Sequence, residues 1–204
     1  MTADPVETAA PMDGATDGAL HRQGTLGGSL ERLRALLLAE GGLMASLVAE
    51  PHTEVSISHT PPLGPAQLAA SGPRATGHGA DYELLMETIY EGYLLHYGAS
   101  RVVRPSEEDL GLLAGDRLYA LGLARLVELG DIEAVAELAD VITLSALARA
   151  GATPELAEAV WMAGAQTVGW GAGAGYEEAK DLLRVGSPEA LQALRRLGPA
   201  RDTS

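Results

Sequence analysis

The feature that most constrains the fold is a long amphipathic segment, Ser106–Leu129, whose apolar surface carries small residues at intervals. Its leucine, tyrosine and valine side chains recur at helical spacing. Glycine inside a helix costs about 1 kcal/mol relative to alanine, so Gly111, Gly115 and Gly122 indicate positions where a neighbouring helix approaches closely. We therefore expect a helix that is packed tightly inside a bundle.

Helical start and stop signals continue on both sides of this segment. Asp81 is expected to cap a helix that ends at Tyr97, and Ser106 with Asp109 forms a near capping box for the central helix. The remaining boundaries are marked by Gly130-Asp131, Gly151, Thr153-Pro154, Ser187-Pro188 and Gly198-Pro199. These signals predict an all-α helical bundle of about six helices.

The chain divides into four parts by composition. Residues 1–28 are predicted to be a disordered tail, and residues 29–50 an amphipathic helical segment that Gly41-Gly42 divides into two pieces. Residues 51–80 are rich in Pro, Gly, Ser and Thr and are predicted to be a linker, with a few extended residues at Val55–Ser58. Residues 81–198 form the helical domain. The N-terminal region is thus expected to be largely flexible.

The charge balance argues against several classes of partner. The net charge is −14, and residues 81–198 contain nineteen acidic against nine basic side chains. Such a surface repels phosphate backbones and anionic lipids, so we expect no nucleic-acid binding. Residues 159–175 are uncharged but too short for a membrane span, so no stable membrane insertion is expected. With no apolar leader and no cysteine, a cytoplasmic location is predicted.

Three glutamates stand one helical turn apart on the helix that precedes the central segment. Glu83, Glu87 and Glu91 share one helix face, and His96 lies nearby in the sequence. A solvated acidic stripe is the favoured interpretation. A carboxylate-bridged metal site at these glutamates, in an enzyme of its own kind, is the alternative. Helical metal proteins of this type use Glu-x-x-His pairs on two helices, which this chain lacks.

The central segment carries a family resemblance. From Asp109 it reads Asp-Leu-Gly-Leu-Leu-Ala-Gly-Asp-Arg-Leu-Tyr-Ala-Leu-Gly-Leu-Ala-Arg-Leu, and Val127-Glu-Leu-Gly-Asp-Ile-Glu-Ala-Val follows. This run resembles the Leu-Ala-Gly-Asp helix of the trans-polyprenyl diphosphate synthase family. It is most similar to the non-catalytic small component of two-component heptaprenyl diphosphate synthases. The similarity extends over residues 81–150 and implies a truncated isoprenoid-synthase fold.

The chain departs from the catalytic members of that family in its acidic residues. Those members hold Mg²⁺ with two aspartate-rich motifs, because Mg²⁺ prefers hard oxygen ligands that it shares with phosphate. Here the corresponding helix reads Glu91-Gly-Tyr-Leu-Leu-His-Tyr97, and no Asp-Asp pair occurs in the chain. We expect no catalytic residue, metal site or cofactor in this chain, and Mg²⁺ only in a catalytic partner.

The resemblance therefore predicts a non-catalytic subunit. It would bind a catalytic polyprenyl diphosphate synthase subunit and support chain-length control in isoprenoid quinone biosynthesis. Asp116 is expected to be structural, orienting the preceding loop through Arg101 or Arg104. The residues predicted to form the partner interface are Tyr93, Tyr97, Leu112, Gly115, Tyr119 and Gly122.

A second hypothesis belongs to another class of protein, a homo-oligomeric helical scaffold or adaptor without enzymatic activity. The position of Asp116 separates the two hypotheses. An Asp116 that faces solvent, on a central helix that packs only within its own chain, favours the scaffold.

Overall fold

The computed structural model describes residues 28–50 and 63–197. Within these ranges every regular element is a helix, and the only extended pairing is an isolated antiparallel bridge between Val48 and Val103. The predicted all-α class is therefore confirmed. The helices are 28–40, α2 Gly42–Ser46, α3 Pro65–Ala70, the 3-10 helix η1 Pro73–Ala75, α4 Gly79–Tyr97, α5 Glu108–Leu129, α6 Ile132–Ala150, α7 Pro154–Trp170, α8 Tyr176–Arg184 and α9 Ala190–Leu197.

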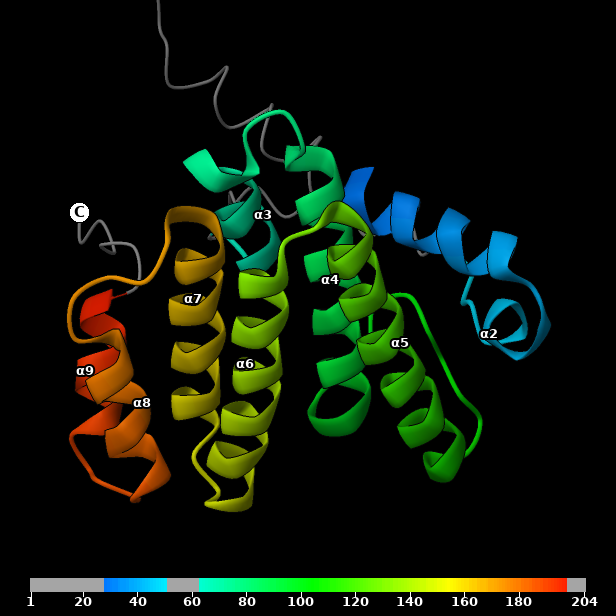
Figure 1. The fold of residues 1–204 in the computed structure, drawn as a ribbon. Helices are drawn as coiled ribbons and strands as arrows, with labels where there is room; N and C mark the ends of the chain where they lie inside the picture. Colours follow the sequence, from blue (N-terminus) through cyan, green and yellow to red (C-terminus); the bar gives the residue numbers. More distant parts are fainter. Residues whose placement is uncertain (1–27, 51–62, 198–204) are drawn as a thin grey trace, which may run out of the picture.

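Four long helices form the body of the molecule (Figure 1). Helix α4 pairs with α5 and α6 pairs with α7, while short α3 contacts both α4 and α7 and so links the two pairs. The short helices α8 and α9 pack against each other beside α7. Residues 28–50, which we call the N-terminal arm, extend from the α4–α5 pair toward one side of the molecule (Figure 1).

Small residues allow α4 and α5 to approach closely. A Cβ atom on Gly122 would lie 2.3 Å from Ile89 Cγ1, and one on Gly115 would lie 2.5 Å from the ring of His96. On the α4 side, a Cβ on Gly92 would lie 2.9 Å from the Gly115 carbonyl oxygen. The close approach predicted for Gly115 and Gly122 is therefore confirmed, and the neighbour is α4 of the same chain.

The junction of α5 and α6 confirms the predicted stop and start signals. Gly130 adopts a left-handed conformation with φ 78°, which ends α5. The Asp131 carboxylate then caps α6 by accepting a hydrogen bond from the Ala134 N–H at 3.0 Å. The same carboxylate accepts the Tyr82 hydroxyl at 2.5 Å and pairs with Arg74 at 3.1 Å. One aspartate therefore joins α4, η1 and α6.

Two predicted helix starts are wrong by a few residues. Helix α4 begins at Gly79, so Asp81 lies in its first turn and does not cap it. Helix α5 begins at Glu108, and its N-cap residue Glu107 makes no side-chain capping bond. The near capping box at Ser106 is therefore not formed. The division of residues 29–50 is confirmed, because Gly41 separates helix 28–40 from α2.

The prediction of a linker over residues 51–80 is wrong for residues 65–80. These residues form α3, η1 and the start of α4, and Ala66, Leu68 and Ala69 are buried in the main core. Close packing is possible because Gly72 meets Gly169 of α7, where an added Cβ would lie 2.2 Å from the Gly169 carbonyl oxygen. Apolar periodicity does not predict α3, because its side chains are small and prolines flank it. Residues 51–62, with the strand proposed at 55–58, and the tail over 1–27 lie outside the described residues.

The apolar core has two parts. The main cluster draws residues from α3, η1 and α4–α9, and includes fully buried Trp161, Met86 and Leu138. The second cluster lies beneath the N-terminal arm and consists of Leu33, Leu37, Met44, Leu47, Val102, Val103, Ala114 and Leu118. The arm is thus packed on its own apolar base.

We predict that Gly122→Ala destabilises the chain. The new methyl group meets Ile89 Cγ1 at 2.3 Å and the Leu85 carbonyl oxygen at 3.2 Å. Overpacking costs up to about 3 kcal/mol, which outweighs the gain of about 1 kcal/mol in helix propensity. Chemical denaturation measures the loss. Gly28→Ala is the control, since a Cβ there meets nothing within 4 Å. Equal stability changes in the two variants would contradict the close-packing account.

A second prediction concerns Asp131. Burial alone would raise its pKa, but hydrogen bonds from Tyr82 and the Ala134 N–H and the charge of Arg74 outweigh burial and lower the pKa. A group whose folded pKa is lowered stabilises the fold above its unfolded pKa, and this contribution is lost as pH falls through the folded value. Asp131→Asn keeps a capping side chain but removes the charge, and should cost about 1–2 kcal/mol near neutral pH.

The measurement is the free energy of unfolding of both proteins between about pH 6 and about pH 2. The difference between wild type and Asp131→Asn should shrink toward low pH. The opposite effect of Glu137, whose pKa is raised by burial, is present in both proteins and cancels. A difference that stays constant with pH would refute the role of the charge.

Candidate functional site

The three glutamates of α4 are buried. Glu83, Glu87 and Glu91 are 4%, 2% and 0% exposed, so the predicted solvated acidic stripe is wrong. Buried carboxylates require partners, because desolvation of an unpaired charge costs several kcal/mol. The structure supplies those partners from the arm, from α3 and from the loop between α4 and α5.

Glu91 holds the loop that leads into α5. Its Oε1 accepts hydrogen bonds from the backbone N–H groups of Arg101 at 2.7 Å, Val102 at 2.6 Å and Val103 at 3.2 Å. Its Oε2 accepts from the Arg101 guanidinium at 3.2 Å. Three successive N–H groups that converge on one carboxylate fix the loop backbone, and bonds to an ionised acceptor are among the stronger ones.

Arg101 and Gln67 connect the other two glutamates. Glu87 accepts hydrogen bonds from Arg101 at 2.5 Å and from Gln67 Nε2 at 3.3 Å. Glu83 accepts hydrogen bonds from Gln67 Nε2 at 3.3 Å and from Arg32 at 2.7 Å. Burial alone would lower the pKa of Arg101, but Glu87 and Glu91 outweigh it and raise that pKa. Two arginines and a glutamine thus neutralise or solvate the three acids.

This pairing argues against the metal-site alternative. The carboxylates that would have to bind the ion already contact guanidinium groups, which a cation would have to displace. Among residues 28–50 and 63–197, no group of three or more His, Asp or Glu side chains has an arrangement that suits a metal ion. His96 lies apart from Glu83, Glu87 and Glu91, with its ring stacked on Tyr119 at 5.4 Å between centroids.

The role predicted for Asp116 is wrong. Its side chain is 70% exposed, and its contact is with His96 Nε2 at 3.2 Å. Arg101 is directed at the glutamates of α4 instead, and Arg104 is exposed, with only its backbone N–H bonded, to the Leu47 carbonyl at 2.9 Å. The loop is therefore oriented by Glu91 and not by Asp116.

The six residues predicted to form the partner interface divide into three buried, two exposed and one half-buried. Gly115, Gly122 and Tyr93 are buried within the chain, so their interface role is corrected to internal packing. Leu112 and Tyr97 are 40% and 38% exposed, and for them the interface role stays a prediction. The sixth, Tyr119, is half-buried against α4 and the main core.

An aromatic row occupies the contact of α4 with α7. The ring of Trp161 lies 5.0 Å from Tyr90 and 5.3 Å from Tyr93, and the Arg149 guanidinium lies 5.7 Å from the Tyr93 ring. Burial raises the pKa values of Tyr90 and Tyr93, so both phenols remain protonated at neutral pH. The row is apolar packing with hydroxyl groups at its edge. Tyrosines at positions i, i+3 and i+7 of α4 were the available sequence signal.

Exposed apolar side chains lie on α5 and α6, two helices that contact each other near the turn that joins them (Figure 1). Leu113 of α5 is 63% exposed and Ile132 of α6 is 60% exposed. Both belong to a set of exposed, uncharged residues at helical spacing, which we call the α5–α6 face; on α5, the charged side chains of Asp116 and Arg117 lie between Leu113 and the rest of the set. Its members are Leu113, Ala120, Ala124, Val127, Ile132, Ala136, Ala139, Thr143 and Ala150.

The charged side chains of α6 are turned away from this face. Asp140 binds Lys180 at 2.9 Å and Arg184 at 3.1 Å, on the side where α8 packs. Glu133 pairs with Arg74 at 2.8 Å, and Arg149 is directed at the tyrosines of α4. The sequence-based prediction did not include this face, because it was based on the buried side of the central helix.

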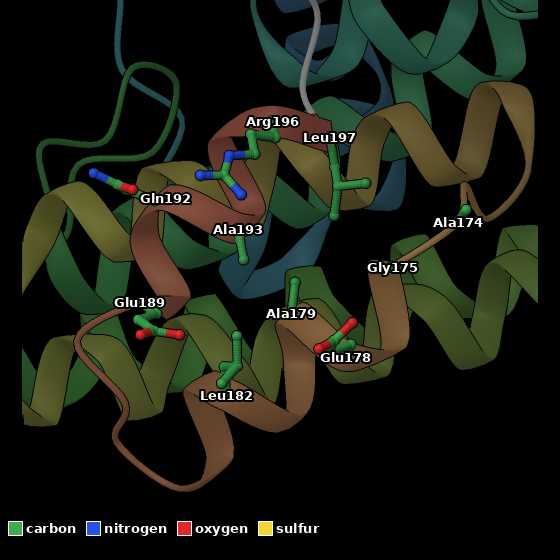
Figure 2. Close-up of a pocket in the computed structure, with 10 residues that line it drawn as sticks. All are labelled: Ala174, Gly175, Glu178, Ala179, Leu182, Glu189, Gln192, Ala193, Arg196 and Leu197. Atoms are coloured by element: carbon green, nitrogen blue, oxygen red, sulfur yellow. The ribbon is translucent and has the colours of Figure 1, made fainter.

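A groove of about 530 Å³ lies between α8 and α9 (Figure 2). Small and aliphatic side chains line its floor, including Ala179, Leu182 and Leu197. The polar side chains Glu178, Glu189, Gln192 and Arg196 stand apart from one another around it (Figure 2). In that view they do not converge on one point of the groove.

Comparison of the chain with protein-family models, with curated proteins and with solved structures found no match. Among the described residues, no helix combines the length and the apolar character that crossing a membrane requires.

We predict that Arg101→Ala strongly destabilises the chain. It leaves Glu87 and part of Glu91 buried without a cation, and removal of one partner of a buried ion pair costs about 3–5 kcal/mol. The matched control is Arg104→Ala, in the same loop but exposed, which should change stability by less than about 0.5 kcal/mol. Thermal and urea unfolding of both variants measure this. Similar losses at the two positions would contradict the role given to Arg101.

Proposed function

We propose that the chain is a non-catalytic helical subunit that binds a helical partner through the α5–α6 face. The observation that carries this proposal is the uncharged outer side of α6. From Ile132 to Ala150 the outward positions are Ile, Ala, Ala, Thr and Ala, while the charged residues of the helix are paired on its flanks. Contiguous exposed apolar surface on a folded chain is typical of a protein–protein interface.

The shape of the face suits a helix. Ala120 and Ala124 on α5, with Ala136 and Ala139 on α6, leave room for another helix to approach closely. Leu113 lies at one end and Ile132 at the other, so larger side chains can anchor the contact. An interface core with few charges and larger apolar anchors is the pattern of stable association.

The resemblance supports a particular partner, a catalytic polyprenyl diphosphate synthase subunit. It is carried by residues 109–135, which form α5 and the start of α6, the two helices that bear the proposed face. The internal pairing of Glu83, Glu87 and Glu91 supports a structural use of the α4 acids. In this proposal the partner holds Mg²⁺ and the allylic diphosphate, and this chain helps to set product length.

A homo-oligomeric scaffold is the second candidate, and the position of Asp116 favours it. That carboxylate is 70% exposed, which meets the first of the two conditions set for the scaffold hypothesis. The same face would then pair with its copy about a two-fold axis.

The test is to place a charge on the face. Ala139→Arg should weaken binding of the partner at least 10-fold, because an unpaired guanidinium would be desolvated at the centre of the contact. Ala172→Arg, an exposed alanine in the α7–α8 connection, is the matched control. Binding to a catalytic synthase subunit from the same genome is measured by titration, and self-association by light scattering.

The outcomes separate the candidates. Tight binding of the synthase that Ala139→Arg alone disrupts supports the heteromeric subunit. A wild-type dimer that Ala139→Arg dissociates, with no synthase binding, supports the scaffold. A monomer that binds no synthase, or an Ala139→Arg variant that binds like wild type, overturns the proposal.

A further inference from the structure

We propose that the surface beneath the N-terminal arm is a docking groove for a helix, and that it accepts the arm of a second copy of the chain in place of its own. This exchange uses a different surface from the α5–α6 face and does not depend on the function proposed above. The proposal starts from the separate apolar cluster beneath the arm, which shares no member with the main core.

The arm binds as an amphipathic helix lies in a groove. Leu33 and Leu37, one turn apart, are fully buried against the chain. The groove is lined by Ala114 and Leu118 of α5 and by Val103 of the preceding loop, with Val102 beside it. The opposite side of the arm is exposed, including Leu38, so its contact with the body is one-sided. Anchors at i and i+4 are the recognition pattern of helix-in-groove binding.

Polar contacts fix the register of the arm at both of its ends. Arg32 donates to Glu83 at 2.7 Å near the start of the helix. Beyond α2, Val48 forms an antiparallel bridge with Val103, flanked by two hydrogen bonds of 2.9 Å. In one the Ala49 N–H donates to the Val102 carbonyl, and in the other the Arg104 N–H donates to the Leu47 carbonyl. The pair Arg117–Glu40 lies between these two contacts.

The groove is costly to leave empty. Without the arm, Glu83 loses its guanidinium partner, and Leu118 and Val103 lose their apolar cover. An occupant must therefore bring an arginine directly before the first of two leucines spaced by four residues. The arm of another copy has this pattern in Arg32, Leu33 and Leu37, so exchange of arms restores every contact that opening breaks.

The connection between arm and body is long enough for either arrangement. Twelve residues separate Glu50 from Leu63, and thirteen extended steps span at most about 45 Å. Exchange of an identical element between copies is a low-cost route to a dimer.

The bridge provides the test. Val48 and Val103 face each other in an antiparallel pair without direct hydrogen bonds between them, in which Cα atoms lie about 4.5 Å apart. This separation is within reach of a disulfide. Because the chain has no cysteine, a disulfide between Val48→Cys and Val103→Cys reports only on this contact. The double variant V48C/V103C must oxidise, and failure to do so overturns the docked arm itself.

For exchange, the two single variants are mixed as folded, reduced full-length chains of different mass, incubated at physiological salt and then oxidised. We expect a disulfide-linked V48C–V103C heterodimer that increases with incubation time. An excess of a synthetic peptide of residues 28–50 should suppress formation of the heterodimer. The same peptide with Arg32→Ala should require at least a 10-fold higher concentration for equal suppression. The control replaces Val48→Cys by Ser46→Cys, exposed on the arm but not opposite Val103.

A heterodimer yield no higher than that of the Ser46→Cys control would overturn the exchange, since the double variant shows that both cysteines can pair. Equal suppression by the two peptides would overturn the requirement for the arginine.

Discussion

The structure depends on one buried carboxylate, that of Glu91. Its oxygens collect three backbone N–H groups and a guanidinium from a single loop, and they do so in the interior, where each bond is stronger than in water. The loop is thereby fixed against α4, and α5 begins from a defined point. Only then can Gly115 and Gly122 reach the backbone and side chains of α4. The same loop supplies Val102 and Val103 as the base of the N-terminal arm.

This arrangement explains why the acidic residues of α4 contribute to the structure of the chain. Arg32 and Arg101 bind the α4 acids, and Lys180 and Arg74 bind those of α6. Cations are few in this chain, and many of them are used to join helices. The outward positions of α6 carry small and aliphatic side chains, which are the basis of the proposed partner surface.

The sequence predicts local structure correctly at positions where the backbone allows few side chains. Gly130-Asp131 and the glycines of α5 have few alternatives, because a left-handed turn and a close helix contact each exclude larger side chains. The glutamates of α4 could not be placed in this way. A spacing of four residues is compatible with a solvated helix face and with a buried one. The side chains that pair with these glutamates in the interior, Arg32 and Arg101, lie on other elements. Asp116 was misplaced for the same reason, since its environment depends on which side of α5 faces the loop.

The central claim is that Arg101 and the α4 glutamates form one coupled buried network, and a double-mutant cycle tests it most directly. The free energy of unfolding is measured for wild type, Arg101→Met, Glu87→Gln and the double variant. The account predicts that the double variant loses less than the sum of the single losses, by at least about 1 kcal/mol, because each substitution removes the charge that the other leaves unpaired. Additive losses would contradict it.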